Sequence, residues 1–275
     1  MQPVKANTHK PRDYLFNPSG IFWRVNRQAA LLIGGGSALL MQIAHPKIAA
    51  AVNDHSSFRE QPFRRLYRTI NAMQDIIFAD RETGLATASR IREIHGRVHG
   101  TLRESTAVYP QGTAYSAEDG DLVVWVFATL IETMLRTHAV LFAPLSDLEK
   151  ESFYRESRQI AALLGAPDDL VPPTFPAFEH YFRNMLDGPV LEITSAAKSI
   201  ARDLMDPRSL PIPTSVISIP AIALLPTPLR DRFGFVWDAR RQLAWDLAQS
   251  ALRGAVQVAP EIVGVMAGAR VGERR

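Results

Sequence analysis

Apolar residues recur at the three- and four-residue spacing of amphipathic helices along nearly the whole chain. Proline and glycine punctuate these segments, and there are few runs in which apolar and polar residues alternate as they do in strands. Residues 122–142 are apolar around most of a helical circumference, which predicts a helix in the centre of the fold. We therefore predict an all-α protein built as a multi-helix single domain.

Prolines, glycines and capping residues also predict where the helices begin and end. Ser37 follows a run of three glycines and is a suitable N-cap, whereas Pro46 predicts a break near His45. Ser146 with Glu149 three residues later has the pattern of a capping box. The expected helices are residues 38–52 with that break, 62–78, 84–104, 122–142, 147–164, 176–185 and 231–252, and residues 106–119 are expected to form a loop.

The two ends of the chain differ from its middle. Residues 1–20 are expected to form an N-terminal tail, residues 21–255 the helical domain, and residues 256–275 a weakly ordered C-terminal tail. The N-terminal residues lack the apolar core of an export signal, so we expect a cytoplasmic protein. Residues 29–44 are the most membrane-like stretch, but they are fewer than the roughly 18–20 residues that a bilayer requires. No transmembrane segment is predicted.

The composition narrows the possible chemistry. The chain has 275 residues, of which 47% are hydrophobic and 21% charged, as in an ordinary globular domain. The net charge of +3 is mild, and basic residues are interspersed with acidic ones, so no nucleic-acid partner is predicted. The chain has no cysteine, which excludes disulfides, thiolate catalysis and cysteine-ligated metal centres and fits a reducing compartment.

His95 falls on the apolar stripe of the expected helix 84–104. With His95 at zero on a helical wheel, Ala88 lies at about +20° and Ile91 at about −40°. Burying an imidazole without a partner costs about 1–3 kcal/mol, so we expect the ring to bond to a backbone carbonyl, a carboxylate or a metal. From this helix alone, a core histidine that donates to a backbone carbonyl is the default interpretation.

His99 lies four residues after His95, a spacing that brings two imidazoles within reach of one metal ion on a single helix. The glutamate of a zinc-peptidase motif is missing, and no Glu-x-x-His repeat supports a carboxylate-bridged di-iron site. A haem iron, by contrast, needs only one imidazole and basic groups for its propionates.

The most basic short cluster is Arg64, Arg65 and Arg68, followed by Thr69. These residues lie opposite the apolar stripe of the expected helix 62–78, as on a solvated face. The alternative is that this second face lines an internal pocket, where the arginines pair with carboxylates of a cofactor or substrate.

A series of short motifs follows one another between Leu31 and Asp187. They are Gln42-Ile43-Ala44-His45-Pro46-Lys47, Arg65-Leu66-x-x-Thr69, Ile91-Arg92-x-x-His95-x-x-Val98-x-Gly100, Tyr115-x-Ala117, Trp125-Val126-x-Ala128-Thr129-Leu130, Pro144-Leu145-Ser146 and Leu163-Leu164-Gly165. In this order they resemble the domain shared by fungal MpaB-type oxygenases and bacterial rubber oxygenase, the latex-clearing protein.

The resemblance implies an all-α domain with a globin-like helical core that binds haem b and activates dioxygen in the rubber-oxygenase branch. His95 matches the proximal iron ligand of that branch. Arg65, Arg68 and Thr69 match its distal Arg-x-x-Lys-Thr segment, with arginine in place of lysine. Arginine stays charged and cannot ligate iron as a lysine amine does, so a lysine-ligated closed state is not expected here.

These observations lead to a haem b-dependent oxygenase with His95 as the metal ligand and Arg65, Arg68 and Thr69 as catalytic residues. The two arginines are expected to line the distal pocket or to bind the propionates. The partners would be dioxygen and a small or lipid-like apolar substrate; the sequence names no redox partner. The alternatives are a cofactor-free helical protein that binds an apolar ligand, and a non-haem metal enzyme that uses His95 and His99.

Overall fold

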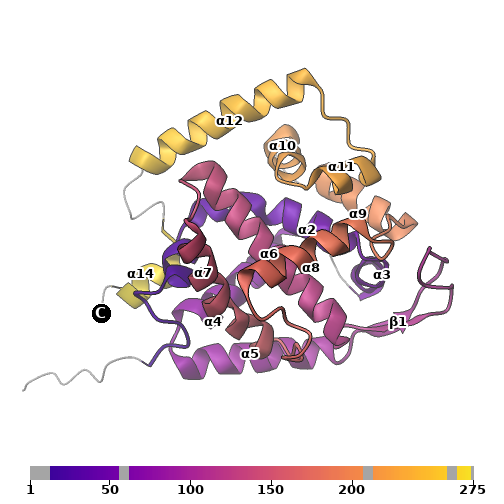
Figure 1. The fold of residues 1–275 in the computed structure, drawn as a ribbon, viewed down its shortest axis with the longest axis horizontal. Coiled ribbons are helices and arrows are strands. Elements are labelled where there is room, and N and C mark those ends of the chain that lie inside the picture. Colours follow the sequence, from indigo (N-terminus) through magenta and orange to yellow (C-terminus); the bar gives the residue numbers. More distant parts are fainter. Residues whose placement is uncertain (1–12, 56–61, 207–212, 259–264, 274–275) are drawn as a thin grey trace, which may run out of the picture.

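The computed structural model describes residues 13–55, 62–206, 213–258 and 265–273, and for residues 62–67 and 271–273 it describes the backbone alone. The described part of the chain is almost entirely helical, as predicted, with one small two-stranded sheet (Figure 1). The elements are α1 (Ile21–Asn26), the 3₁₀ helix η1 (Ala29–Gly34), α2 (Gly35–Ile43), α3 (Pro46–His55), α4 (Pro62–Phe78), α5 (Arg81–His95), β1 (His99–Thr101), β2 (Ala114–Ser116), α6 (Gly120–Leu141), α7 (Asp147–Leu163), α8 (Phe175–Asp187), α9 (Ser195–Met205), α10 (Ser215–Ala223), α11 (Thr227–Phe233), α12 (Ala239–Val258) and α14 (Ala267–Glu273).

Helix α6 occupies the centre, as its composition predicted (Figure 1). It packs against η1, α2, α7 and α12, and most of its apolar side chains are buried in one continuous core. Trp125 is fully buried, stacks on Phe182 and donates its indole N–H to the carbonyl oxygen of Met41 at 3.1 Å. This bond satisfies the one polar atom of the largest side chain of α6.

The three consecutive glycines, residues 34–36, do not precede a helix that is capped by Ser37, as we expected. Gly34 ends η1 and α2 begins at Gly35, so Ser37 lies inside α2 and is not its N-cap. A Cβ on Gly34 would lie 2.5 Å from both Thr133 Cγ2 and Thr137 Oγ1 of α6. The glycine therefore allows two helical segments to approach closely, which is a packing function and not a capping one.

The expected break near His45 is confirmed. Helix α2 ends at Ile43, α3 begins at Pro46, and the two segments are bent by 110°. Proline lacks the N–H that would continue the hydrogen-bond ladder of α2, and it suits the first turn of α3. The break leaves His45 deep in the protein, with 2% of its surface exposed.

The segment after His95 corrects our prediction. Helix α5 ends at His95 instead of continuing to about residue 104, and the chain turns at Gly96 into β1. Strand β1 pairs with β2 in antiparallel register, with His99 opposite Ser116, so part of the expected loop 106–119 is a strand. The long-range pairing of two three-residue strands carries little local signal, and the turn residues Pro110 and Gly112 between them are its only mark in the sequence.

The C-terminal third also differs from expectation. The expected helix 231–252 is divided into α11 and α12, because Gly234 adopts the left-handed conformation at φ = 72° and ends α11. Residues expected to be a weakly ordered tail include α14, which packs against α4 and buries Ala269. In the expected N-terminal tail, Leu15 and Phe16 are buried in the core. Apolar burial against distant helices fixes both segments.

One described helix, α6, is long and apolar enough to cross a membrane, with half of its most apolar window buried inside the protein. The bent pair 29–43 and 46–55 would pass the same test if taken as one span. The core position of α6 accounts for its composition without a bilayer.

Candidate functional site

Helices α4 and α5, which carry the predicted site residues, follow one another in the chain and pack against each other. Asp80 caps the start of α5 by accepting a hydrogen bond from the Thr83 N–H at 2.9 Å, which fixes the short turn between the helices. At Gly84 the helices approach so closely that a Cβ would lie 3.3 Å from the carbonyl oxygen of Ile76. This contact sets the register of the pair.

The two predicted segments lie at equal distances along their helices from the contact between Gly84 and Ile76. Residue 65 lies eleven positions before Ile76, and His95 lies eleven positions after Gly84, which is about 16 Å along each helix. Positions 65, 69, 72 and 76 recur at intervals of four, three and four, so they share one stripe of α4. Positions 84, 88, 91 and 95 form the matching stripe of α5.

The site residues of α4 are only partly described. Arg68 and Thr69 lie within α4 and are exposed, and Thr69 takes part in an interaction. The side chain of Arg65 lies outside the described residues, so its predicted role in the distal pocket or at a propionate stays a prediction. What the fold establishes is that α4, the helix that contains this basic segment, packs against α5, the helix that ends at His95.

His95 is half-buried at the C-terminal end of α5, not in the closed core that the stripe predicted. Burial lowers the pKa of its imidazole, and the nearby carboxylate of Glu118 partly offsets this effect. No residue in the described part of the chain makes a hydrogen bond to this side chain, so the expected backbone carbonyl partner is not found there. A neutral imidazole with a nitrogen that is not engaged is suited to binding a metal.

The pairing of His95 with His99 on one helix face is wrong. His99 lies on β1 and is exposed, and its backbone carbonyl oxygen lies 3.0 Å from Nε2 of His55. Within the described residues there is also no group of three or more His, Asp or Glu side chains arranged to hold a metal ion. The premise of the non-haem alternative, two imidazoles one helical turn apart, is therefore removed.

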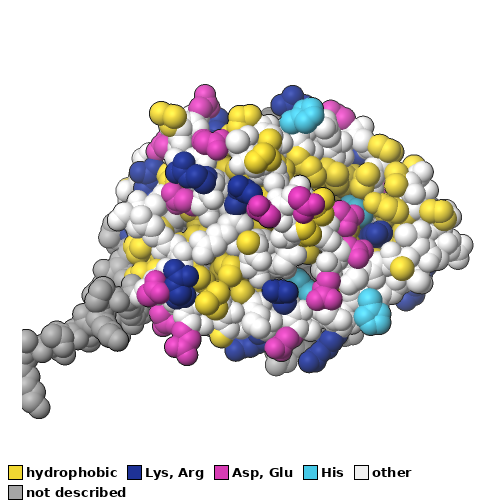
Figure 2. All heavy atoms as spheres, turned by 60° about the horizontal axis from the view of Figure 1, so that its bottom comes forward, with side chains coloured by type: hydrophobic (Ala, Val, Ile, Leu, Met, Phe, Trp, Pro, Cys, Tyr) yellow, Lys and Arg dark blue, Asp and Glu magenta, His cyan; other side chains and the backbone are white. Residues whose placement is uncertain are grey.

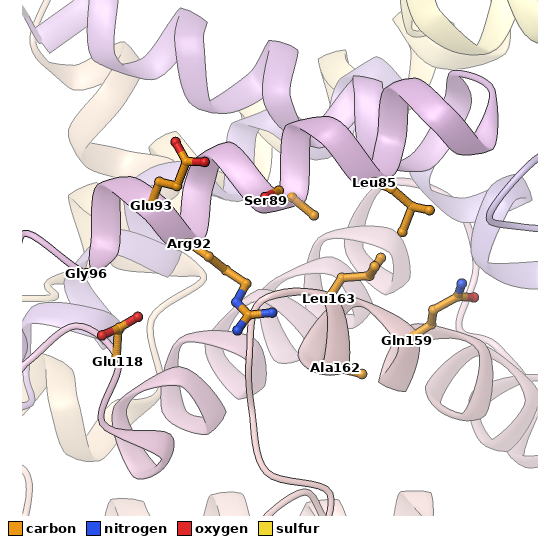
Figure 3. Close-up of a pocket in the computed structure, with 10 residues that line it drawn as sticks. Leu85, Ser89, Arg92, Glu93, Gly96, Glu118, Gln159, Ala162 and Leu163 are labelled. Carbon is orange, nitrogen blue, oxygen red and sulfur yellow. The ribbon is translucent and has the colours of Figure 1, made fainter.

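A pocket of about 660 Å³ lies beside this site, between α5 and α7 (Figure 3). Leu85 and Ala88 of α5 face Ala162 and Leu163 of α7 and form its apolar part. Arg92 directs its guanidinium into the pocket from α5, and Glu118 lies near the end of that helix (Figure 3). Arg92 and Glu93 are both exposed and both line this pocket.

The face of the molecule that Figure 2 brings forward carries interspersed charges. Lys and Arg side chains alternate with Asp and Glu side chains among apolar ones, and they form no continuous basic patch on this face.

Two residues near the site were not singled out by the sequence. Glu118 follows β2, and the β1–β2 pairing brings it to Gly96, where a Cβ would lie 3.4 Å from its Oε1. His45 was noted only for its helix break, yet its buried Nδ1 has no hydrogen-bond partner within the described chain. Its ring lies 5.7 Å from that of Tyr109, and burial, with the Lys47 charge, lowers its pKa to about 4.

The sequence of this all-α domain matches one family of known proteins. The model of the family described as "ER-bound oxygenase mpaB/B'/Rubber oxygenase, catalytic domain" matches residues 23–257. The chain belongs to this family of oxygenase domains.

Two curated relatives are similar along most of their length. The uncharacterized proteins Mb2261 of Mycobacterium bovis and Rv2237 of Mycobacterium tuberculosis are each 25% identical over 231 residues, which cover 81% of this chain and 87% of the relative. No solved structure matches the chain. The family match, not these relatives, therefore carries the functional argument.

Proposed function

We propose that this protein is a haem b-dependent oxygenase that acts on a small or lipid-like apolar substrate. The observation that carries the proposal is His95, a half-buried imidazole at the end of α5 with no hydrogen-bond partner in the described chain, on a helix that packs against α4, the helix of Arg68 and Thr69. Membership of the oxygenase family supports the reaction class.

The residues present fit haem b. His95 would hold the iron through its neutral ring, because burial favours the unprotonated form that can bind a metal. The bound group would supply the iron chemistry that activates dioxygen. The donor set also favours haem over a bare metal ion, since one imidazole is sufficient for haem and no cluster of three donors occurs among the described side chains.

The chain's own polar residues have distinct roles in this proposal. Arg65 and Arg68 carry permanent positive charges, so they bind propionates or line the distal side but do not ligate iron. Thr69 has a hydroxyl that donates a hydrogen bond to dioxygen or water. The apolar part of the substrate is proposed to lie against Leu85, Ala88, Ala162 and Leu163 in the pocket beside α5, whose other lining includes the charged side chains of Arg92, Glu93 and Glu118.

The test is an ultraviolet–visible spectrum of protein expressed with a haem precursor, recorded with and without dithionite. The wild type is expected to show a Soret band that the His95→Ala variant lacks. His99→Ala is the matched control, because His99 is a nearby histidine that is exposed on β1. Stoichiometric haem retained by His95→Ala would refute the assignment.

Arg68→Ala tests the distal side separately. It is expected to retain haem, because Arg68 lies on the other helix and is exposed, and to change the rate at which the ferrous protein oxidises in air. An unchanged autoxidation rate would count against a role for Arg68.

A second candidate, a cofactor-free protein that binds an apolar ligand, is favoured by the 660 Å³ pocket with its apolar wall. It predicts a colourless wild type that binds fatty or isoprenoid probes. The same spectrum separates the two functions, since only the oxygenase requires a Soret band.

A further inference from the structure

Helix α12 lies on the outside of the molecule, along the edge opposite α5 (Figure 1). It packs inward on α6 and α10, and Trp245 is its one buried residue. Gln249 and Arg253 fasten it to the end of α6 by donating to the carbonyl oxygen of Val140 at 3.5 Å and 2.5 Å. One face of a 20-residue helix is thus fixed, and the opposite face is open to solvent.

The open face carries an apolar stripe. Leu243 is 60% exposed, Leu247 64% and Val258 81%, and the stripe between them is completed by Ala251 and Gly254. On a helical wheel with Leu243 at zero, these residues fall within about 80° of one another, whereas Trp245 lies at about 200°. The stripe extends about 22 Å along the helix. Large apolar side chains repeated on one open face indicate a surface that becomes covered.

The charges beside the stripe are mainly positive. Arg240 lies on the same face, Arg253 lies at one flank, and both are exposed. Asp246 is the one acidic residue of α12, and its carboxylate accepts a hydrogen bond from Gln242 at 2.8 Å. The exposed apolar stripe is therefore bordered by more positive than negative charge, in a chain whose net charge is +3.

A second copy of the chain fits this face less well than a lipid surface does. A helix about 30 Å long and 10 Å wide offers a footprint of roughly 300 Å², whereas a stable interface buries about 800 Å² per partner. Pairing two such faces would also bring their arginines together. An apolar stripe with arginines at its sides instead fits the boundary between lipid headgroups and acyl chains.

We propose that the outer face of α12 binds the surface of an anionic lipid bilayer, with Leu243, Leu247 and Val258 entering the headgroup boundary and Arg240 and Arg253 contacting anionic headgroups. The helix lies parallel to the membrane and remains attached to α6 by its inner face. This inference is independent of the proposed haem chemistry.

Co-sedimentation of the purified protein with vesicles tests the proposal. The wild type is expected to bind vesicles of phosphatidylcholine with phosphatidylglycerol more tightly than vesicles of phosphatidylcholine alone, and salt is expected to weaken the binding. The double variant Leu243→Glu/Leu247→Glu is expected to lose about tenfold or more in affinity. Leu148→Glu is the matched control, because Leu148 is an isolated leucine on α7 that is 83% exposed.

Variants that remove a charge from α12 test the electrostatic part of vesicle binding, since loss of a positive charge should weaken the binding and loss of a negative charge should strengthen it. Arg240→Gln, at a residue that takes no part in the attachment of α12 to α6, is expected to weaken binding to anionic vesicles by about fivefold. Asp246→Asn is expected to strengthen it, since it removes the one carboxylate of the helix. Circular dichroism of each variant checks that the fold is intact.

Two outcomes would overturn the proposal. Equal sedimentation of Leu243→Glu/Leu247→Glu and wild type would show that this face is not the contact. A wild type that ignores vesicles but sediments as a dimer, which the same double variant dissociates, would assign the face to a second copy of the chain. Sedimentation velocity without vesicles provides that measurement.

Discussion

The contact between η1 and α6 and the contact between α4 and α5 both bring two helices together at a glycine, but they differ in how far they exclude solvent. Each has a glycine where the helices approach closely, Gly34 in the first and Gly84 in the second. At Gly34 the neighbouring side chains Thr133 and Thr137 are almost completely buried. Along the α4–α5 pair, burial is complete at Ile76 but lost at Thr69, and His95 is half-buried.

The difference shows how one fold provides both rigidity and access. The η1–α6 contact at Gly34 excludes water even from the hydroxyl groups of Thr133 and Thr137. The α4–α5 contact is closed at its turn and open to solvent at its other end, where the proposed ligand lies. A helix anchored at one end places a residue accurately while leaving space at the other.

The largest expected effect is on the closed region. Trp125→Ala should lower the free energy of unfolding by about 3–5 kcal/mol, because it empties a fully buried site and leaves the Met41 carbonyl without its donor. Urea unfolding followed by circular dichroism measures this loss. Arg68→Ala, in the open region, should change the same quantity by no more than about 0.5 kcal/mol. Similar losses in the two variants would break the comparison.

The next largest effect is on the pH dependence of the free energy of unfolding, to which His45 contributes. His45 is held neutral because burial lowers its pKa to about 4, whereas its pKa in the unfolded chain is 6.5. The unfolded state therefore binds the proton first, and stability that is fully present above pH 6.5 is lost as the pH falls toward 4, by about 3 kcal/mol.

His45→Gln should flatten this pH dependence of the free energy of unfolding, and His99→Gln, an exposed histidine outside the core, should leave it unchanged. Urea titrations at several pH values between 7.5 and 4.5 would decide the matter. A His45→Gln protein with the full wild-type slope would assign the acid sensitivity to other groups.

A smaller effect on the free energy of unfolding is expected at Gly34 and Gly35, where the same substitution should act in opposite directions. Gly34→Ala should destabilise the protein by about 1–3 kcal/mol, since its Cβ would lie 2.5 Å from two side-chain atoms of α6. Gly35→Ala has no atom within 4 Å of the new Cβ and should be neutral or stabilise α2 by up to about 1 kcal/mol. Thermal melts of the two variants compare them directly, and equal shifts would contradict the close-packing account.

The smallest effect on stability is expected at the proposed ligand itself. In protein prepared without cofactor, His95→Ala should change the free energy of unfolding by less than about 1 kcal/mol, because the side chain is half-exposed and makes no hydrogen bond within the described chain. Chemical denaturation of the cofactor-free protein measures it. A loss as large as that of Trp125→Ala would show that His95 is a structural residue of the core.

Local sequence signals predicted the elements with strong caps and breakers. Pro62 and Phe78 bound α4 as expected, Ser146 and Glu149 form the capping box of α7, and Thr174 caps α8 by accepting from the Ala177 N–H. These signals act between residues three or four positions apart. Nothing elsewhere in the fold is required for them to operate.

The sequence by itself determined the all-α class, the break before Pro46 and the stripe that carries Ala88, Ile91 and His95. Only the tertiary structure decided that α5 stops at His95, that the glycine run packs against α6, and that one face of α12 stays open. The first two depend on partners far along the chain: β2 for the end of α5, and Thr133 and Thr137 for Gly34. Periodicity gives a helix its faces, but the packing of distant segments decides which faces are covered.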